Sequence, residues 1–213
     1  MSTLTIAAGR PTIADRLFAR TILLDLVLVA AGAALTAIAA QIAIPLWPVP
    51  VTMQTLAVLL VGVSPGAVRG ALSMVLYAVL GIVGLPVFSD ASSGFSVIAG
   101  PTGGYIVGFI FAAGFTGWLA QRQWDRKVLR SILAFLGGTV VVFAFGLPWL
   151  AYALGTLGAP NDLNSVLQAG LYPFIVGGIA KALLAAGIIA ASWRAIERGD
   201  ARRARRKAAQ EQL

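Results

Sequence analysis

The sequence predicts an all-α, polytopic membrane protein with six transmembrane helices and both termini in the cytoplasm. Three observations support this prediction: the composition of the chain, its six apolar stretches, and the placement of its lysine and arginine residues. Of its 213 residues, 59% are hydrophobic and 11% are charged, whereas soluble domains have roughly 45–50% apolar and about 25% charged residues. This composition excludes a soluble enzyme, a disordered chain and a nucleic-acid-binding domain.

Six apolar stretches follow one another along the chain. They are Ile22–Ile44, Thr52–Val63, Ala67–Leu85, Thr102–Ala120, Val128–Leu157 and Leu171–Trp193. A spanning helix needs about 20 residues, so we expect the second stretch to be re-entrant or steeply packed. In the fifth stretch, Pro148 follows Gly146 and Leu147 and should kink or break the helix. The longest polar connection, residues 86–101, joins the third and fourth stretches.

Lysine and arginine residues define the orientation of the chain. All but one of the 16 lie at the termini or in and immediately around alternate connections. They are Arg10, Arg16, Arg20, Arg69, Arg122, Arg126, Lys127, Arg130, Arg194, Arg198, Arg202, Arg203, Arg205, Arg206 and Lys207. The other three connections contain no lysine or arginine and hold Asp90 and Asp162. Because cytoplasmic loops are enriched in lysine and arginine, six crossings with both termini inside satisfy every connection.

This topology divides the chain into three parts. Residues 1–20 form a cytoplasmic segment, residues 21–194 form the six-helix membrane domain, and residues 195–213 form a basic cytoplasmic tail. We interpret the tail as a determinant of topology that is attracted to anionic lipid. The adjacent lipid bilayer is therefore its expected partner, and nucleic acid is not.

Lys181 is the exception, because it lies inside the sixth apolar stretch. It follows the outer start of that stretch by about ten residues, hence roughly 15 Å at 1.5 Å per residue. A cation near the bilayer centre costs roughly 2.5–3.5 kcal/mol, so it needs a partner or a function. Asp25 lies near the inner end of the first stretch, at a different depth. We interpret Lys181 as an anion-binding ammonium that faces a cavity; the alternative is a side chain that snorkels or binds backbone carbonyls.

The chain lacks the residue sets of the common enzyme classes. It contains no cysteine and no histidine, which excludes thiol nucleophiles, thiolate metal sites and the commonest general base. It has no G-x-x-x-x-G-K-S/T phosphate loop and no Ser-His-Asp set. We therefore expect no enzyme activity, catalytic residue or metal, but the transport of a molecule that carries a negative charge. A membrane enzyme acting on lipid-linked substrates is the hypothesis from a different class.

Three motifs of the sequence bear on its function. The first is the proline-rich IPLWPVPVTMQTL at residues 44–56, the second is GLPVF at residues 84–88, and the third is AGPTGGY at residues 99–105. Together with YPF at residues 172–174 and with Lys181, they resemble the BioY family. Members of this family are the biotin-specific substrate-binding (S) components of energy-coupling-factor (ECF) transporters.

The resemblance covers about residues 30–186 and implies both a fold and a function. In this family, six helices enclose a vitamin site that opens to the outside, and a coupling membrane protein with a pair of ATPases drives release inward. It implies biotin uptake as a multi-pass protein of the bacterial inner membrane. ATP is then used by the partners, and this chain needs no cofactor of its own. Capture of another anionic vitamin, and biotin transport without a dedicated ATPase, are the alternatives.

A biotin site needs an apolar wall, a few polar groups that match the ureido ring, and a cation. The resemblance places a binding lysine at Lys181. The family commonly has an aspartate three residues earlier, where this chain has Gly178. This difference removes an acceptor for the ureido N–H groups and a counter-ion for the lysine. Asp90 in the outer connection, or a backbone carbonyl near Gly177 and Gly178, could substitute.

Polar residues of the first and third motifs are further candidates. Gln54 offers a donor and an acceptor for a ureido group or a carboxylate. Thr52 and Thr55 are three residues apart and are expected to share a helix face, although threonine hydroxyls often bond their own backbone. Tyr105 suits the lining of a vitamin pocket; the alternative is an ordinary interfacial tyrosine.

Two glycines and two aromatic residues complete the candidates. Gly103 would let backbone N–H groups approach a ligand closely, whereas Gly104 is expected to serve helix packing. Trp47 and Phe88 are expected to wall or gate the outer mouth of the site, with interfacial anchoring as the alternative.

The first apolar stretch carries small residues at helical spacing, namely Ala30, Ala33, Ala34 and Ala37. Small residues at this spacing let another helix approach closely. The resemblance implies that this surface docks onto the coupling protein. The alternative is packing within the chain.

Overall fold

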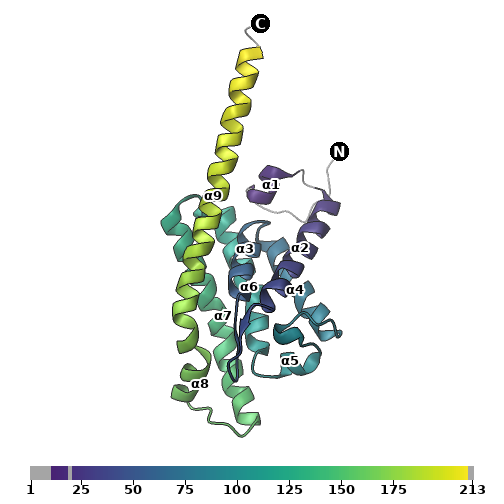
Figure 1. Ribbon diagram of the computed structural model, residues 1–213, viewed down its shortest axis with the longest axis vertical. Helices are drawn as coiled ribbons and strands as arrows, with labels where there is room; N and C mark the ends of the chain where they lie inside the picture. The colour runs from purple at the N-terminus through teal and green to yellow at the C-terminus, as the bar shows by residue number, and fades with distance from the viewer. Residues whose placement is uncertain (1–10, 19–20, 211–213) are drawn as a thin grey trace.

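The computed structural model describes residues 11–18 and 21–210, and these residues are mostly helical (Figure 1). The α-helices are α1 (Ile13–Leu17), α2 (Ile22–Ala40), α3 (Gln54–Val63), α4 (Ala67–Ile82), α5 (Phe95–Ala99), α6 (Gly103–Gln121), α7 (Val128–Thr156), α8 (Leu163–Gly170) and α9 (Tyr172–Gln210). Two 3-10 turns, η1 (Ser89–Ala91) and η2 (Trp124–Arg126), and two short antiparallel strands, β1 (Ala43–Ile44) and β2 (Val51–Thr52), complete the elements of the described residues. Arg10 and Arg20, which entered the charge argument, lie outside the described residues.

All six apolar stretches contain a helix, but four helices in the described part of the chain are long and apolar enough to cross a membrane. These are α2, α6, α7 and the part of α9 up to Arg206. The other two, α3 and α4, have 10 and 16 residues. The predicted break at Pro148 is wrong, because α7 continues through it without interruption. Neighbouring helices can compensate for the lost backbone hydrogen bond, and Gly146 packs directly against the Tyr105 ring on α6.

The connections that carry basic residues gather at one end of the bundle. A backbone hydrogen bond joins α1 to Ser64, in the turn between α3 and α4. An ion pair of 3.7 Å between Arg16 and Asp200 joins α1 to α9. The indole of Trp193 on α9 donates to Asp125 of η2 over 2.7 Å. The elements α1, η2 and the C-terminal half of α9 therefore share one end, and α5 and α8 lie at the other (Figure 1).

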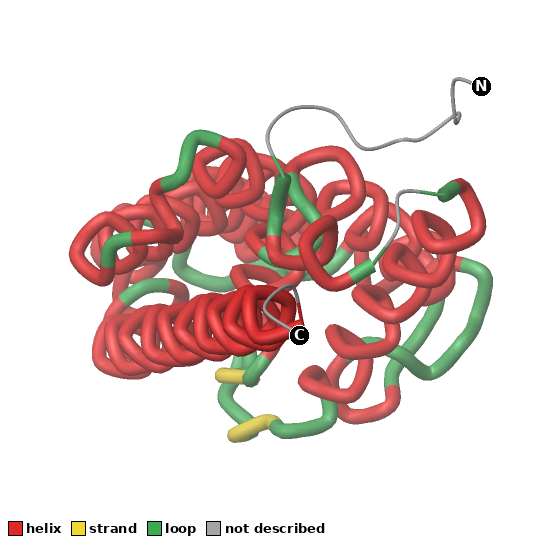
Figure 2. The backbone as a smooth tube through the Cα atoms, turned by 90° about the horizontal axis from the view of Figure 1, so that it is seen from above, coloured by secondary structure: helices red, strands yellow, loops and turns green. Residues whose placement is uncertain are grey.

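Close helix crossings centre on α6, where small residues face α7 and α4. A Cβ atom at Gly104 would overlap Trp149, and one at Gly108 would meet the Val142 backbone. Small residues permit such approaches between membrane helices, as predicted for Gly104. Seen from above, the helices pack around one another and the short strands lie at the margin (Figure 2).

The predicted boundary between residues 194 and 195 falls inside a continuous helix, because α9 extends from Tyr172 to Gln210. The basic tail is therefore a helical extension of the last membrane segment as far as residue 210. It projects from the bundle rather than folding back along its end (Figure 1).

A buried ion cluster ties three helices together at the basic end. The guanidinium of Arg69 donates to the Asp15 carboxylate on α1 over 2.7 Å and forms an ion pair with Asp25 on α2. The exposed fractions of the three side chains are 1%, 4% and 0%. Arg69 lies just after the turn between α3 and α4, as expected, but in the first turn of α4 it is buried rather than exposed. Its partners provide the physical reason, because paired charges can be buried where single ones cannot.

We predict that Arg69→Met lowers the free energy of unfolding by about 3–5 kcal/mol, the range for breaking a buried pair. The substitution leaves two carboxylates buried without their cation. Thermal unfolding of the purified protein measures the effect, with Arg130→Met, an exposed arginine on α7, as the control. Equal melting temperatures for the two variants would contradict a structural role for the cluster.

Candidate functional site

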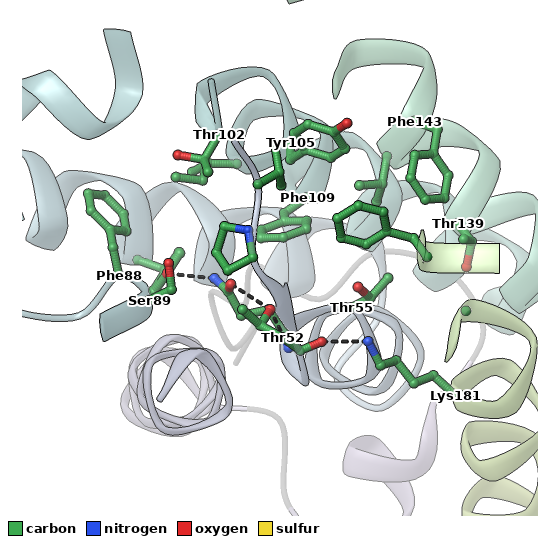
Figure 3. A pocket seen from close by; sticks show the side chains of 18 of the residues that line it. Thr52, Thr55, Phe88, Ser89, Thr102, Tyr105, Phe109, Thr139, Phe143 and Lys181 are labelled. Atoms are coloured by element: carbon green, nitrogen blue, oxygen red, sulfur yellow. Dashed lines mark hydrogen bonds between the residues drawn. The ribbon is translucent and has the colours of Figure 1, made fainter. Parts of the chain in front are cut away.

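A cavity lies among α3, α4, α6, α7 and α9, and residues that precede α3 or flank η1 also line it (Figure 3). It is lined by Val49, Pro50, Thr52, Gln54, Thr55, Tyr77, Phe88, Ser89, Val97, Thr102, Tyr105, Ile106, Phe109, Thr139, Val142, Phe143, Phe174, Gly178 and Lys181. The side chains leave about 50 Å³ of free space, against roughly 300–1,000 Å³ in typical small-molecule sites. A vitamin-sized ligand therefore requires the lining to move apart.

Lys181 is half-buried on α9 and reaches the cavity wall. Its ammonium donates a hydrogen bond to the backbone carbonyl of Thr52 in β2 (Figure 3). Both interpretations of this residue thus describe part of its geometry, because it lines a cavity and also binds a backbone carbonyl. A neutral carbonyl leaves the ammonium's charge uncompensated, so the cation can still attract an anion.

A hydrogen-bonded chain of three polar side chains forms one wall. The Thr52 hydroxyl donates to Gln54 Oε1 over 2.8 Å, and Gln54 Nε2 donates to the Tyr77 hydroxyl over 2.7 Å. The Tyr77 hydroxyl accepts this bond and keeps its own proton for donation. The predicted shared helix face of Thr52 and Thr55 is wrong, since Thr52 lies in β2 and α3 begins at Gln54. Both threonines nevertheless line the cavity.

Sequence reasoning missed Tyr77, although a tyrosine inside an apolar helix carries a hydroxyl that needs a partner when buried. Tyr77 is 0% exposed. Its position one helix away from Gln54 depends on how α3 and α4 pack, which no local pattern reports.

Aromatic rings form the opposite wall. Tyr105 stacks with Phe174 at 6.3 Å between ring centroids and meets Phe143 edge-on at 6.1 Å. The Tyr105 hydroxyl donates to the Gly170 carbonyl over 2.9 Å, so the ring rather than the hydroxyl faces the cavity. Phe88 is 1% exposed and lies edge-on to Tyr77. Tyr105 lines the cavity as expected, and Phe88, which was expected at the outer mouth, lines the cavity instead. Phe143 was missed.

Two predicted residues lie outside the lining of this cavity. A Cβ atom at Gly103 would overlap the Ile98 carbonyl, so this glycine is required for close packing at the start of α6. Asp90 is exposed in η1 and lines an outer recess of about 540 Å³ together with Trp47. That recess shares four lining residues with the cavity, including Ser89 and Thr102, which places Asp90 at the mouth rather than in the cavity.

Gly178 lies one helical turn before Lys181 and also lines the cavity. A Cβ atom there would meet only Thr139, whose Cγ2 would be 3.6 Å away. The position therefore has room for a side chain. The Thr139 hydroxyl donates to the Phe135 carbonyl over 2.9 Å, so its oxygen can still accept a hydrogen bond from a ligand. Sequence reasoning did not single out Thr139.

The alanine residues on α2 do not form one surface. Ala30 and Ala34 are exposed, whereas Ala33 is 2% exposed and packs in the core, with Ala37 half-buried against the same cluster. The prediction of one docking stripe is therefore wrong for Ala33 and Ala37. Ala30 and Ala34 form one row along the helix and Ala33 and Ala37 form the adjacent row, and the bundle covers only the second row.

Comparison with known proteins agrees with this geometry. The sequence matches the BioY family over residues 12–198. The biotin transporter BioY of Rhizobium etli is 38% identical over 65% of this chain and 75% of its own length. A probable biotin transporter BioY of Pyrococcus horikoshii is 38% identical over 74% of this chain and 89% of its own length.

The fold is similar to a solved structure described as the S-component for biotin from an ECF-type ABC transporter. The TM-score is 0.69 at 24% identity, over 81% of this chain and 92% of that chain. The family match extends over most of the sequence and includes every residue that lines the cavity. This chain therefore belongs to the BioY family.

Proposed function

We propose that this chain takes up biotin as the membrane substrate-binding component of an ECF transporter. The observation that carries the proposal is Lys181, an ammonium held by a neutral carbonyl at the wall of an aromatic-lined cavity. Biotin offers the matching groups, namely a carboxylate, a ureido group and an apolar bicycle. In this proposal the chain crosses the bacterial inner membrane six times with both termini inside, and the cavity faces outward.

Binding then replaces one hydrogen bond by a stronger one. The Lys181 ammonium leaves the Thr52 carbonyl and meets the biotin carboxylate, because a carboxylate adds the attraction of an opposite charge to the hydrogen bond. Gln54 and Tyr77 offer donors to an oxygen acceptor of the ligand, and Thr139 offers an acceptor to a ureido N–H. The aromatic rings of Tyr105, Phe143 and Phe174 cover the apolar part.

We predict that Lys181→Met weakens biotin binding at least tenfold while the protein still inserts and folds. Lys181→Arg should retain part of the affinity, because a planar guanidinium replaces a compact point charge. Calorimetric titration of the purified variants with biotin measures both effects, and Lys127→Met, exposed in the connection before α7, is the control.

Biotin amide, whose carboxylate is neutralised, tests which group Lys181 binds. If the ammonium binds the carboxylate, Lys181→Met lowers biotin affinity to the level of the amide and leaves amide binding unchanged. An equal loss for both ligands would contradict the assignment of Lys181 to the carboxylate.

We predict that Gly178→Asp strengthens biotin binding. The added carboxylate has room beside Thr139 and lies one turn from Lys181, where it can accept from a ureido N–H. Gly178→Asn, with the same shape and no charge, is the matched control. Titration of both variants decides the question, and weaker binding in both would indicate that the pocket requires glycine for space.

Two alternatives concern the ligand and the energy source. A titration with a panel of anionic vitamins separates biotin from other ligands of the same charge. Uptake by vesicles with and without the coupling protein and ATPase pair separates ECF-driven transport from solitary transport.

We further propose that Ala30 and Ala34, the exposed pair on α2, dock onto the coupling protein. We predict that Ala34→Trp abolishes co-purification with that protein and ATP-driven uptake, while biotin affinity stays within a few-fold. Ala33→Trp is the contrasting variant, because overpacking a core costs about 1–3 kcal/mol and should lower the melting temperature. Retained co-purification of Ala34→Trp would refute docking at this pair.

A further inference from the structure

A separate groove lies on the side of the bundle, between the start of α7 and α9. Its floor consists of small residues on α9, namely Gly187, Ala190, Ala191 and Ala195, and its volume is about 430 Å³. Val128, the first residue of α7, forms the opposite wall and is 49% exposed. No residue of this groove lines the ligand cavity.

Two arginines stand at one end of the groove. Arg194 and Arg198 are four residues apart and therefore share one face of α9, and both side chains line the groove and are exposed. From Gly187 to Arg198 the groove extends over eleven residues, about 16 Å at 1.5 Å per residue. The groove thus combines an apolar floor with a cationic end.

The two walls are held together by contacts just behind the groove. The Trp193 indole, 4% exposed, donates to the Asp125 carboxylate over 2.7 Å. The Arg126 guanidinium lies over the same indole, 3.3 Å from the ring centroid. Both partners belong to η2, which directly precedes α7. These contacts hold α9 next to the start of α7, and these two helices form the groove.

The position of the groove indicates what occupies it. Its floor belongs to the membrane-spanning part of α9, and its arginines lie where that helix leaves the apolar stretch. They also lie at the end of the bundle that holds α1 and η2. In the proposed topology, on which this inference rests, that end meets the cytoplasmic leaflet.

We propose that the groove binds an anionic phospholipid of the cytoplasmic leaflet. Arg194 and Arg198 bind its phosphate, because guanidinium groups match phosphate oxygens through paired hydrogen bonds. One acyl chain lies along the floor, where small residues leave space. Basic pockets between membrane helices on this side suit anionic headgroups. A second copy of the chain would instead bring the same two arginines toward one another, since a two-fold contact pairs like surfaces.

The test compares purified protein in detergent with added dioleoyl phosphatidylglycerol or dioleoyl phosphatidylcholine. We expect phosphatidylglycerol to raise the melting temperature more than phosphatidylcholine. In the double variant Arg194→Gln/Arg198→Gln, the apparent affinity for phosphatidylglycerol should fall at least fivefold. The matched control is Arg202→Gln/Arg203→Gln, which removes the same charge from α9 beyond the groove. It should retain the wild-type affinity.

A second variant tests the floor without changing charge. A Cβ atom at Gly187 meets nothing within 4 Å, so Gly187→Leu fills the groove without disturbing the core. It should also weaken phosphatidylglycerol binding at least fivefold, and inorganic phosphate alone should not reproduce the stabilisation.

Three results of the lipid titrations would overturn the proposal. They are equal stabilisation by the two lipids, equal losses in the two double variants, and stabilisation by free phosphate that matches phosphatidylglycerol. A dimer in light scattering that Gly187→Leu dissociates would also overturn it, in favour of a second copy. Biotin affinity, measured on the same samples, should not change in the groove variants. A wild-type protein that binds the lipid but not biotin would contradict the proposed function alone.

Discussion

The cost of burying a charge among apolar helices is the constraint on which the rest of this structure depends. For Arg69, ion pairs with the carboxylates of Asp15 and Asp25 offset this cost, and these ion pairs join α1, α2 and α4. For Lys181, a hydrogen bond to a neutral acceptor, the Thr52 carbonyl, offsets part of the cost of burial. Arg69 is buried together with two carboxylates that outnumber its charge, whereas Lys181 is bound to a carbonyl and keeps its net charge. The Arg69 cluster is therefore structural, and Lys181 is the cation of the proposed binding site.

Thr52 connects the parts of the proposed site. Its carbonyl accepts from Lys181 on α9, and its hydroxyl donates to Gln54 at the start of α3. A ligand that draws the ammonium away from this carbonyl also acts on β2 and on the polar wall that ends at Tyr77. Because the free space in the cavity is small, we expect ligand binding to require movement of β2 at the same time.

The long helix α9 carries both cationic sites. Lys181 and Arg194 are thirteen residues apart, about 20 Å along the helix axis, and the residues that line the cavity and the groove do not overlap. The contacts of Trp193 with η2 hold this helix against the end of the bundle. We therefore expect that substitutions can alter the proposed ligand site and the proposed lipid site separately.

The sequence by itself determined the helical class, the six apolar stretches, the gathering of basic residues in alternate connections, and membership of the BioY family. Each depends on composition or on motifs that are continuous in the chain. It also singled out Lys181, because a cation in an apolar stretch is costly, and Gln54 and Tyr105, because they lie in motifs that resemble the family. The tertiary structure alone decided that Arg69 is buried, that Tyr77, Thr139 and Phe143 complete the cavity, and that Ala33 faces inward while Ala34 does not. These outcomes depend on which faces of neighbouring helices meet, and that choice is made by packing between segments distant in the sequence.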